Sequence, residues 1–473
     1  MATHWSELPF ALLLHFAFVL AGLLTYAVGT HASGQRRHPS AALAWVLTIA
    51  LLPYLGLPLY LMLGTRKFSR PSVLPVQAAH RQLDNTLQNG AMATLQGMGL
   101  APPESHARIC FHSDGQAAWD ELVALINSAQ TQLDICTFVL GNDAHGQHVA
   151  RLLEKRTAQG VRVRLLLDAV GSWRTSGAMV RRLRASGVLV VWYMPVLFNL
   201  LRGRGNMRNH RKLAIADGQR FWSGGRNLAA EYFTGKHHKR PWKDLSFTMD
   251  GPLAAQAQTL FSSHWHHSQG PQTLGYEAAL NLLPTTAPLT ARAPLQHLAQ
   301  MVPSGPDQAE DTFSDLLLTA LFRARKQVLA VTPYFVPDET LLKALCLAAR
   351  RGVQVELIMP ARSNHRLADF ARARALRDLV AAGGQVRLAT SMVHAKVVVI
   401  DDALALCGSL NLDARSLFLN YELMVAFYDS QDISIVTQWI KTNFHNLPSY
   451  HPSQPSLGRD IAEGLVRWLG FQI

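Results

Sequence analysis

The sequence contains few cysteines. Only four occur in 473 residues, and no two of them have the C-x-x-C spacing of a zinc or redox site. All four lie in apolar surroundings, at Cys110, Cys136, Cys346 and Cys407. We therefore expect reduced thiols in the core rather than disulfides or zinc ligands, which agrees with a catalytic region facing the cytosol.

Charged residues are absent from two stretches near the N-terminus, residues 9–29 and 41–64. As a helix, each stretch is long enough to cross a hydrocarbon core of about 30 Å. No Lys or Arg precedes the first stretch, so the basic region of a signal peptide is missing. The sequence therefore predicts a two-helix transmembrane hairpin within residues 1–65, its second helix kinked by Pro53 and Pro58. The alternative is a hydrophobic hairpin buried in a soluble core.

Acidic residues are fewer than basic ones, 32 against 45, which gives a net charge of +13. Such a charge suits nucleic acid or an anionic membrane surface, and the predicted hairpin favours phospholipid over nucleic acid. Arg36 and Arg37 lie between the two apolar stretches, whereas Arg66, Lys67 and Arg70 follow the second. The positive-inside rule then leans slightly towards a cytoplasmic catalytic region.

A second basic group follows the apolar residues 196–201 and comprises Arg202, Arg204, Arg208 and Arg211. This order predicts a segment at the membrane interface, with the apolar part inserted and the arginines on phosphates. An ordinary solvated loop is the alternative.

One polar pattern occurs twice with identical spacing, H-x-K-x4-D-x6-G-[GS]-x-N. Residues two apart in a strand point to the same face, so each H-x-K pair offers an imidazole and an ammonium group to one pocket. The Asn that closes each copy can donate a hydrogen bond to an oxygen. A single copy could be a histidine with ordinary packing beside a solvated lysine, but the exact repeat argues for two half-sites acting on a phosphoryl group. The candidates are His210, Lys212, Asp217 and Asn227 in the first copy and His394, Lys396, Asp401 and Asn411 in the second.

The repeat extends beyond the motif. Apolar strands are predicted at 133–140 and 328–336, each followed by a helical stretch and a second strand. This order predicts βαβ units, with mixed, largely parallel sheets flanked by helices. We expect a first α/β half at 106–268 and a second at 313–473. Residues 66–105 are predicted as a polar connector and 269–312 as the linker between the halves.

An acidic residue opens a strand downstream of each motif, Asp244 in the first half and Glu422 in the second. A carboxylate that accepts a hydrogen bond from one imidazole nitrogen fixes the tautomer and leaves the other nitrogen free to react. We predict that these two residues orient the histidines. A carboxylate on an edge strand or helix face, without this role, is the alternative.

The doubled motif resembles the phospholipase D superfamily, and the whole chain is similar to the membrane-anchored bacterial cardiolipin synthases. The matching segments are 208–212, 224–227 with Glu231 and Tyr232 after it, 332–338 and 408–416. The resemblance implies a two-step phosphatidyl transfer between two phosphatidylglycerol molecules at the bacterial inner membrane, through a phosphatidyl-histidine intermediate. It implies no metal and no cofactor, and it leaves the oligomeric state open.

The same resemblance favours His210 as the nucleophile and His394 as the acid and base, with the opposite assignment left open. Asp217 and Asp401, at probable turns, are expected to brace those turns. Gly225 stands where the second copy has Ser409, so we expect a hydroxyl contact to phosphate from only one half. Rival functions are a phospholipase D hydrolase, a transferase with another alcohol or donor lipid, a nuclease, and a membrane scaffold without activity.

Overall fold

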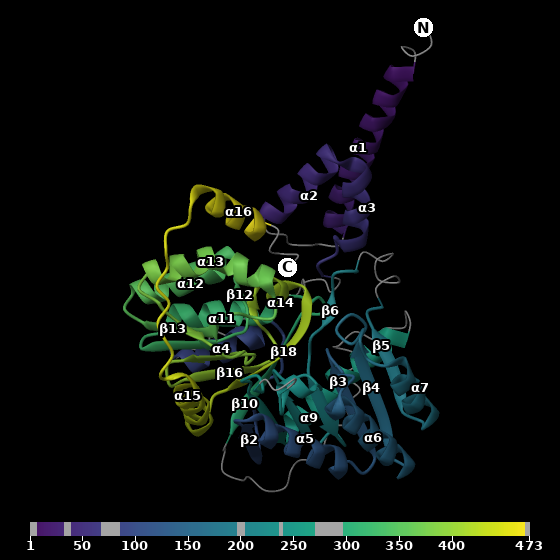
Figure 1. The fold of residues 1–473 in the computed structure, drawn as a ribbon, viewed down its shortest axis with the longest axis vertical. Coiled ribbons are helices and arrows are strands. Elements are labelled where there is room, and N and C mark those ends of the chain that lie inside the picture. Colours follow the sequence, from purple (N-terminus) through teal and green to yellow (C-terminus); the bar gives the residue numbers. More distant parts are fainter. Residues whose placement is uncertain are drawn as a thin grey trace.

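Two β-sheets form the body of the molecule, and apolar helices project from one end of it (Figure 1). The structure, a computed structural model, describes residues 7–32, 39–67, 86–195, 204–235, 240–269 and 297–468. One sheet belongs to each of the two predicted halves, and helices cover their faces. The expected mixed α/β fold with two related halves is confirmed.

The first sheet has seven strands in the order β2-β9-β8-β7-β3-β4-β5. Only β3, β4 and β5 are parallel to one another, and the other neighbours pair antiparallel. The sheet is therefore mixed but less parallel than expected. A short turn of residues 217–219 joins β7 to β8 and allows only antiparallel pairing, whereas the longer segment 225–245 joins β8 to β9. Its elements are β2 (Arg108–His112), α5 (Gly115–Ser128), β3 (Gln132–Thr137), α6 (Ala144–Ala158), β4 (Arg162–Asp168), α7 (Gly177–Ala185), β5 (Leu189–Tyr193), β7 (Leu213–Ala216), β8 (Arg220–Gly224), β9 (Ser246–Asp250) and α9 (Pro252–Gln269).

The second sheet repeats this plan in the order β1-β10-β18-β16-β15-β11-β13-β14, with β6 pairing beside β18. Here β11, β13 and β14 are the parallel strands. The elements are β1 (Glu104–Ser105), β6 (Arg208–Asn209), β10 (Leu298–Ser304), α11 (Thr312–Arg323), β11 (Gln327–Val331), α12 (Glu339–Arg350), β13 (Gln354–Pro360), α13 (Arg366–Ala381), β14 (Gln385–Ala389), β15 (Val397–Ile400), β16 (Leu404–Gly408), α14 (Ala414–Phe418), β18 (Asn420–Phe427), α15 (Ser430–Phe444) and α16 (Leu457–Trp468).

Two segments predicted as connections contribute to the second half. Helix α4 (Leu87–Gly97) lies in the predicted connector 66–105, yet its apolar side chains are buried with those of α11. Strand β10 lies in the predicted linker 269–312, yet it pairs antiparallel with β18 along its whole length. Residues 68–85 and 270–296 of these segments lie outside the described residues. The predicted connector and linker therefore each contain an element, α4 and β10, that buries apolar side chains against the second half.

The N-terminal apolar stretches form one long helix and two short ones. Helix α1 (Glu7–Ala32) is long and apolar enough to cross a membrane over Leu12–His31. The predicted second helix at 41–64 is wrong as a single element, because the chain breaks at Leu52 into α2 (Pro39–Leu51) and α3 (Pro53–Leu63). Pro53 lacks an N–H and disfavours a helical conformation at the preceding residue, and Leu52 has φ −131° and ψ 58°.

One buried hydrophobic cluster contains residues of both halves. Phe247 of the first sheet and Val397 and Val425 of the second belong to a single buried cluster. Two backbone pairings also cross between the halves: β6 with β18, and Lys243 with Val393. The two copies of the motif are therefore held against each other by the fold.

Candidate active site

The two motif histidines lie where the halves cross. The backbone N–H of His210 donates to the Tyr421 carbonyl of the other half at 2.9 Å, and that of His394 donates to the Lys243 carbonyl at 2.7 Å. Tyr421 and Lys243 are the residues immediately before the two predicted orienting carboxylates. Each histidine backbone is thus attached beside the carboxylate of the opposite half.

The carboxylates bind the histidines in a crossed arrangement. The Nδ1 atom of His210 lies 2.9 and 3.0 Å from the two carboxylate oxygens of Glu422. The Nδ1 atom of His394 lies 2.7 Å from Oδ2 of Asp244. The sequence singles out both carboxylates, but it does not show that each one serves the histidine of the other half. With Nδ1 held in this way, the Nε2 atoms are the ones available for chemistry.

Burial keeps both imidazoles neutral. It lowers the pKa of His210 to about 4, against the opposing effect of Glu422. Burial and then Lys396 lower the pKa of His394 to about 3, against the effect of Asp244. Both carboxylates are fully buried, which raises their pKa values, but the histidines and lysines outweigh this and the pKa values of Asp244 and Glu422 are lowered. At neutral pH each site is therefore a neutral imidazole that donates Nδ1–H to an ionised carboxylate.

Both motif lysines are buried beside their histidines. Each ammonium group donates to the backbone carbonyl of the histidine two residues before it. Burial lowers the pKa of Lys212 to about 7 and that of Lys396 to about 8, although the two carboxylates raise both. Two buried cations next to two neutral imidazoles make this a site for an anion, such as a phosphodiester.

The two histidines differ in their surroundings. The His394 ring lies between the rings of Tyr232 and Trp242, with centroid distances of 5.0 and 5.5 Å. Its Nε2 atom is 3.0 Å from the Lys396 ammonium. His210 contacts the Phe138 ring edge-on, and its ring bonds only with Glu422 among the described residues. The exposed fraction of its side chain is 11%, against 5% for His394. The Nε2 of His210 is therefore the more open to an incoming substrate.

The two asparagines brace the loops around the site. The Asn227 amide donates to the Tyr232 hydroxyl at 2.8 Å, and the Asn411 amide donates to the Ser416 hydroxyl at 3.2 Å. The Asn411 side-chain oxygen is buried without a hydrogen-bond partner among the described residues. Their contact with a phosphoryl oxygen stays a prediction.

Gly225 and Ser409, which occupy the same position of the two motif copies, both lie against an orienting carboxylate. The Ser409 hydroxyl donates to Oε2 of Glu422 at 2.5 Å and accepts from the Leu423 N–H at 2.9 Å. It therefore holds the orienting carboxylate, and the expected contact of this hydroxyl with phosphate stays a prediction. At Gly225 a Cβ atom would lie 2.1 Å from Oδ1 of Asp244, so only glycine leaves room for that carboxylate.

We expect Gly225→Ala to reduce turnover strongly and to lower the melting temperature, because the added methyl group displaces Asp244 from His394. Crowding of a packed core costs about 1–3 kcal/mol. The measurements are the thermal unfolding and the lipid turnover of the purified protein in detergent. Ser409→Gly is the matched control, because it makes the second copy resemble the first. It should reduce the melting temperature and the turnover less than Gly225→Ala does. Equal losses in the two variants would contradict this account.

The motif aspartates hold turns away from the imidazoles. Asp217 and Asp401 both have left-handed backbones, with φ of 54° and 52°. The Asp217 carboxylate accepts backbone N–H groups from residues 130–132, and the Asp401 carboxylate accepts those of residues 325–327. Burial raises the pKa of Asp217, but these hydrogen bonds outweigh it and the pKa is lowered. The geometry supports the expected bracing role.

We expect Asp401→Asn to destabilise the fold and to leave the chemistry nearly unchanged. Asn tolerates the left-handed conformation but weakens the charged hydrogen bonds, at a cost of about 1–3 kcal/mol. A lower melting temperature with a turnover number within about twofold would show this, since no contact with the reacting atoms is lost. The matched control is Asp402→Asn, because Asp402 is exposed and, among the described residues, pairs only with the exposed Lys326. A turnover loss of orders of magnitude would place Asp401 in the chemistry instead.

Family models match most of the chain. The family model described as "Cardiolipin synthase, PLD-like domain" matches residues 122–265 and 317–447, which include both motif copies. The chain belongs to the cardiolipin synthase family. A second model, "Phospholipase_D-nuclease N-terminal", matches residues 20–64.

Relatives of the family span nearly the whole chain. Cardiolipin synthase A of Pseudomonas putida is 30% identical over 463 residues, covering 93% of this chain and 94% of the relative. Cardiolipin synthase A of Pseudomonas aeruginosa is 31% identical over 459 residues, covering 93% and 91%. Phosphatidylserine synthase of Haemophilus influenzae has a similar fold, with a TM-score of 0.62 at 14% identity over 81% of this chain and all of that one. The predicted family is confirmed.

Two arginines that the sequence predicts at a membrane interface lie inside the protein instead. Both Arg208 and Arg211 are buried. Arg211 donates to the Glu422 carbonyl at 2.8 Å and contacts His264 and Asp307. Arg208 donates to the Met194 carbonyl at 2.8 Å. Both arginines therefore support the backbone around the site. Arg202 and residues 196–201 of the same predicted segment lie outside the described residues.

Arg226 has a similar supporting role that the sequence did not suggest. Its guanidinium donates to the carbonyl oxygens of Asp244 and Tyr232. The only sequence signal is its place inside the repeated G-[GS]-x-N turn. Arg211 likewise lies inside H-x-K, so the variable positions of the motif carry part of the site's framework.

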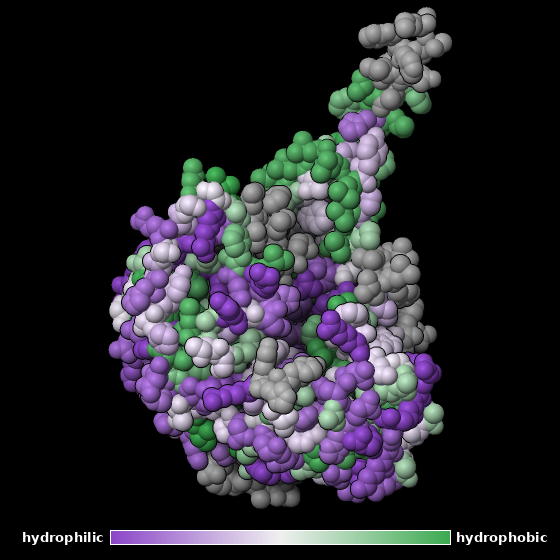
Figure 2. Space-filling view, viewed as in Figure 1, coloured by the Kyte–Doolittle hydropathy of each residue, from purple (hydrophilic) through white to green (hydrophobic). Residues whose placement is uncertain are grey.

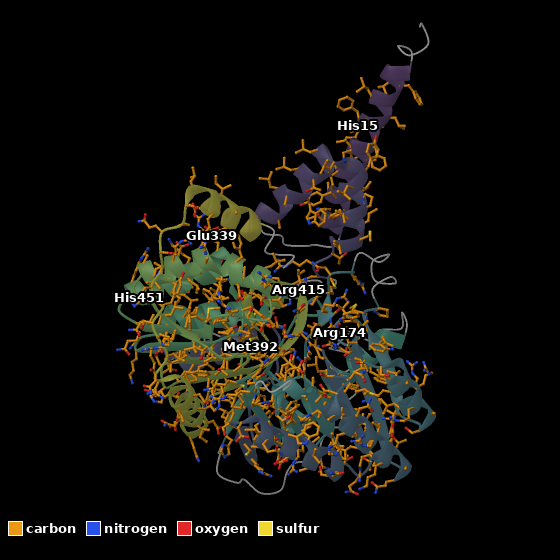
Figure 3. The ribbon with its side chains drawn as sticks, viewed as in Figure 1. His15, Arg174, Glu339, Met392, Arg415 and His451 are labelled. Carbon is orange, nitrogen blue, oxygen red and sulfur yellow. The ribbon has the colours of Figure 1, made fainter. Side chains whose placement is uncertain are left out.

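A hollow opens between the two halves below the apolar helices (Figure 2). Arg174, Met392 and Arg415 lie around this region in Figure 3. Arg415 is held there by hydrogen bonds of 2.8 Å to the side chain and backbone of Asn206. The approach to the site is therefore basic, which suits an anionic headgroup.

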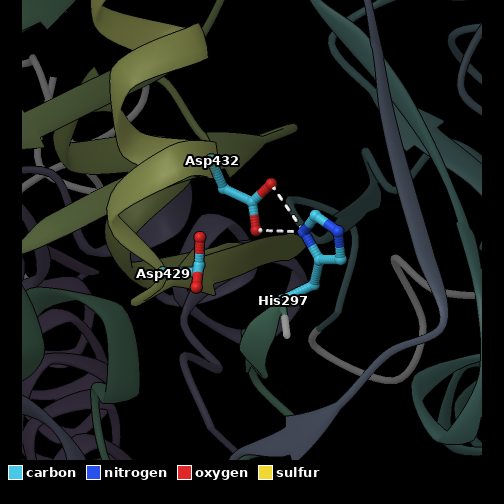
Figure 4. Close-up of side chains that lie close together, drawn as sticks. All are labelled: His297, Asp429 and Asp432. Carbon is cyan, nitrogen blue, oxygen red and sulfur yellow. Dashed lines mark hydrogen bonds and ion pairs between the residues drawn. The ribbon is translucent and has the colours of Figure 1, made fainter. Parts of the chain in front are cut away.

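A histidine and two aspartates gather elsewhere, where β10 meets α15 (Figure 4). Ring nitrogen Nδ1 of His297 lies 3.0 and 3.1 Å from the Asp432 carboxylate oxygens. Asp429 caps α15 by accepting from the Gln431 N–H at 2.9 Å. Each group thus has a structural contact that ties β10 to the start of α15.

Proposed function

We propose that this protein is a cardiolipin synthase. It transfers the phosphatidyl group of one phosphatidylglycerol to a primary hydroxyl of another, giving cardiolipin and glycerol. The observation that carries the proposal is the pair of crossed imidazole–carboxylate contacts, with two buried lysines beside them, in a member of the cardiolipin synthase family. The substrates are membrane phospholipids, in keeping with the apolar N-terminal helix.

In the first step, Nε2 of His210 attacks the phosphorus of the donor. A P–N bond forms, the P–O bond to glycerol breaks, and Nε2–H of protonated His394 gives its proton to the leaving oxygen. The arriving phosphodiester carries the negative charge that raises the pKa of His394 enough for it to hold this proton. Glu422 stabilises the positive charge that develops on His210, which bonds to it through Nδ1.

In the second step, His394 takes a proton from the hydroxyl group of the second phosphatidylglycerol. That oxygen attacks the phosphorus, a P–O bond forms, and the P–N bond to His210 breaks. Lys212 and Lys396 stabilise the negative charge on the phosphoryl oxygens in both steps, together with the amides of Asn227 and Asn411. The greater exposure of the His210 side chain supports its assignment as the nucleophile.

The location follows from the substrates. The catalytic region lies at the inner (cytoplasmic) membrane of a bacterium, facing the cytoplasm, and its basic approach attracts anionic phospholipid. Four cysteines without a disulfide agree with a reducing compartment.

The proposal is tested by incubating the purified protein in detergent with phosphatidylglycerol alone. Cardiolipin and glycerol in equal amounts are expected. Phosphatidic acid without cardiolipin would make the protein a hydrolase. Turnover only after phosphatidylethanolamine is added would change the donor pair, and no product under any condition would contradict the proposal.

We expect kcat/KM to have a bell-shaped pH dependence. Below about pH 4, His210 is protonated and cannot attack. At higher pH kcat/KM falls because His394 must first take up a proton to act as the acid, and above about pH 7 to 8 the fall steepens because Lys212 and Lys396 lose the charges that stabilise the phosphoryl oxygens. Bound phosphodiester raises the lysine pKa values, so the alkaline limb of kcat should lie at higher pH than that of kcat/KM. Rates with a short-chain phosphatidyl substrate measure both.

The control for the alkaline limb is Lys212→Arg, because a guanidinium stays charged throughout this range. At its optimum pH this variant should have a lower kcat/KM than the wild type. At pH 9 it should retain a larger fraction of its own optimum kcat/KM than the wild type retains. A wild-type kcat/KM that rises steadily from pH 7 to 9 would contradict the assignment.

A further inference from the structure

Helices α1 and α3 run in the same direction. Tyr54 contacts Phe18, with ring centroids 5.0 Å apart, and Tyr60 contacts Tyr26 at 5.2 Å. Between these pairs, a Cβ atom at Gly22 would lie 3.7 Å from Leu57. Residue numbers increase together along both helices, so their C-terminal ends lie at the same level.

Helix α2 runs in the opposite direction. Its C-terminal part packs at Gly22, where a Cβ would lie 2.8 Å from Ile49, whereas its earlier residue Trp45 contacts Tyr60 at 5.4 Å. Gly56 packs directly on the backbone of residues 48 and 49, which closes α2 and α3 into a V. The start of α2 and the end of α3 therefore lie at the level of the end of α1.

The tip of this V stops well short of the N-terminal end of α1. With 13 and 11 residues, α2 and α3 are about 20 and 17 Å long, and neither crosses a core of about 30 Å. The tip lies beside Phe18, and α1 continues from there to Glu7 for 11 residues, or about 17 Å. Figure 1 shows α1 extending far beyond both short helices. Only α1, at about 39 Å, spans the full thickness.

The open end of the V is fixed to the catalytic region. The Gly205 N–H donates to the Met62 carbonyl at 3.1 Å. Just after α3, Arg66 and Lys67 form ion pairs with Asp311 at 2.6 and 3.0 Å. The chain thus leaves α3 directly onto the catalytic region.

The tip of the V is apolar and exposed. Leu51, Leu52, Tyr54 and Leu55 have exposed fractions of 55 to 73%. The backbone polar groups at the break are hydrogen-bonded within the segment. The Leu52 N–H donates to the Thr48 carbonyl, and the Leu52 carbonyl accepts from the N–H groups of Leu55 and Gly56. These features fit a tip within hydrocarbon, where an unsatisfied backbone group is costly.

We infer that α2 and α3 form a re-entrant wedge, which enters and leaves the lipid bilayer on the side of the catalytic region, and that only α1 crosses. The N-terminal end of α1 and the catalytic region are then on opposite faces of the membrane. A two-span hairpin would place them on the same face. The inference rests on the membrane location proposed above but not on the chemistry, so its failure would leave the transferase reaction untouched.

The wedge also changes how basic residues are distributed. Arg36 and Arg37 lie outside the described residues, but in the sequence they fall between the ends of α1 and α2, which both lie on the catalytic side. Arg66 and Lys67 follow α3 on that same side, whereas residues 1–6 contain no Lys or Arg. The positive-inside rule, which was nearly balanced for a hairpin, then clearly favours a cytoplasmic catalytic region.

Helix α16 marks the same membrane face. It lies at the end of the body from which the apolar helices project (Figure 1). Its polar side is held by Arg377, which pairs with Glu463 at 2.6 Å. Leu457 and Ile461, one turn apart, are 78% and 57% exposed. Such a helix fits the headgroup region beside the wedge.

The test places single cysteines in the full-length protein in bacterial spheroplasts and labels them with a membrane-impermeant maleimide. The variants are Ala2→Cys, Ser33→Cys, Leu52→Cys and, on α15 in the catalytic region, Ile435→Cys. We expect Ala2→Cys to react in intact spheroplasts, and Ser33→Cys and Ile435→Cys to react only after lysis. Leu52→Cys, at the tip, should react in neither sample.

The unsubstituted protein gives the background, to which Cys110 is the main contributor because the other three cysteines are buried. Retained cardiolipin formation shows that each variant is folded. Labelling of Ser33→Cys in intact spheroplasts, with Ala2→Cys and Ile435→Cys both protected, would show a two-span hairpin and overturn the wedge. Ser33→Cys and Ile435→Cys both labelled in intact spheroplasts would overturn the cytoplasmic assignment.

Discussion

His210→Ala is expected to abolish phosphatidyl transfer, with a loss of at least about 10⁴-fold, because no other group replaces the nucleophile. His394→Ala should also stop cardiolipin formation, since leaving glycerol needs a proton. The two variants should differ with phosphatidyl-p-nitrophenol, whose leaving group needs no acid. His394→Ala should release a burst of nitrophenol equal to the enzyme present and then stall, because it forms the phosphatidyl-histidine but lacks the base for the second step. His210→Ala should release none.

The control is His451→Ala, because His451 is exposed and lies outside the hollow (Figure 3). It should keep wild-type turnover. A burst from His210→Ala and none from His394→Ala would reverse the two roles while keeping the shared site. Full cardiolipin synthesis by either variant would refute a site built from both halves.

Much of the site was predictable because its spacing is local. A histidine and a lysine two apart in an extended segment share a face whatever surrounds them, and the structure brings both pairs together. Asp217 and Asp401 follow four strand residues, where a turn is needed, and both do hold turns. The family resemblance drew on the same local patterns.

What depends on tertiary contacts could not be predicted. The exchange of carboxylates between the halves follows from the pairing of β6 with β18 and of Lys243 with Val393, which involve residues far apart in the chain. Arg211 belongs to a basic cluster that the sequence predicts at the surface, but its guanidinium is buried and donates to Asp307 and to the Glu422 carbonyl. Composition alone does not separate a buried, paired arginine from a solvated one.

In the membrane segment, a proline has a larger structural effect than the kink that the sequence predicts. Pro53 was expected to kink one long helix, and it instead separates two short ones. The outcome depends on Gly56, which lets α3 fold back onto α2. A kink and a reversal thus share the same proline, and the glycine three residues later distinguishes them.

Crossed carboxylates also make the two halves dependent on each other. Each imidazole takes its orientation and its tautomer from the opposite half, so neither motif copy forms a working half-site alone. The carboxylate of each pair is fully buried, and a buried charge without its partner is costly. The arrangement therefore couples closure of the interface to activation of both histidines.

Glu422→Gln is expected to reduce both the nitrophenol burst and cardiolipin formation by about 10³–10⁴-fold, because the amide can donate to Nδ1 of His210 and stabilise the tautomer that carries its proton on Nε2. Asp244→Asn should act on His394 in the same way. It should therefore reduce cardiolipin formation by a similar factor but leave the burst with phosphatidyl-p-nitrophenol. Each substitution thus affects the histidine of the opposite half, as the crossed contacts of 2.9 and 2.7 Å require.

Two measurements separate this positioning role from simple loss of structure. Thermal unfolding should show both variants folded at the assay temperature. The double variant Glu422→Gln with His210→Ala should lose no more activity than His210→Ala alone, because the carboxylate acts through that histidine. The matched control is Glu356→Gln, which removes the charge of a carboxylate paired with Arg387 on a neighbouring strand. If His210→Ala abolished the burst, and Asp244→Asn also removed it while Glu422→Gln kept it, each carboxylate would serve the histidine of its own half, and the crossed site would be wrong.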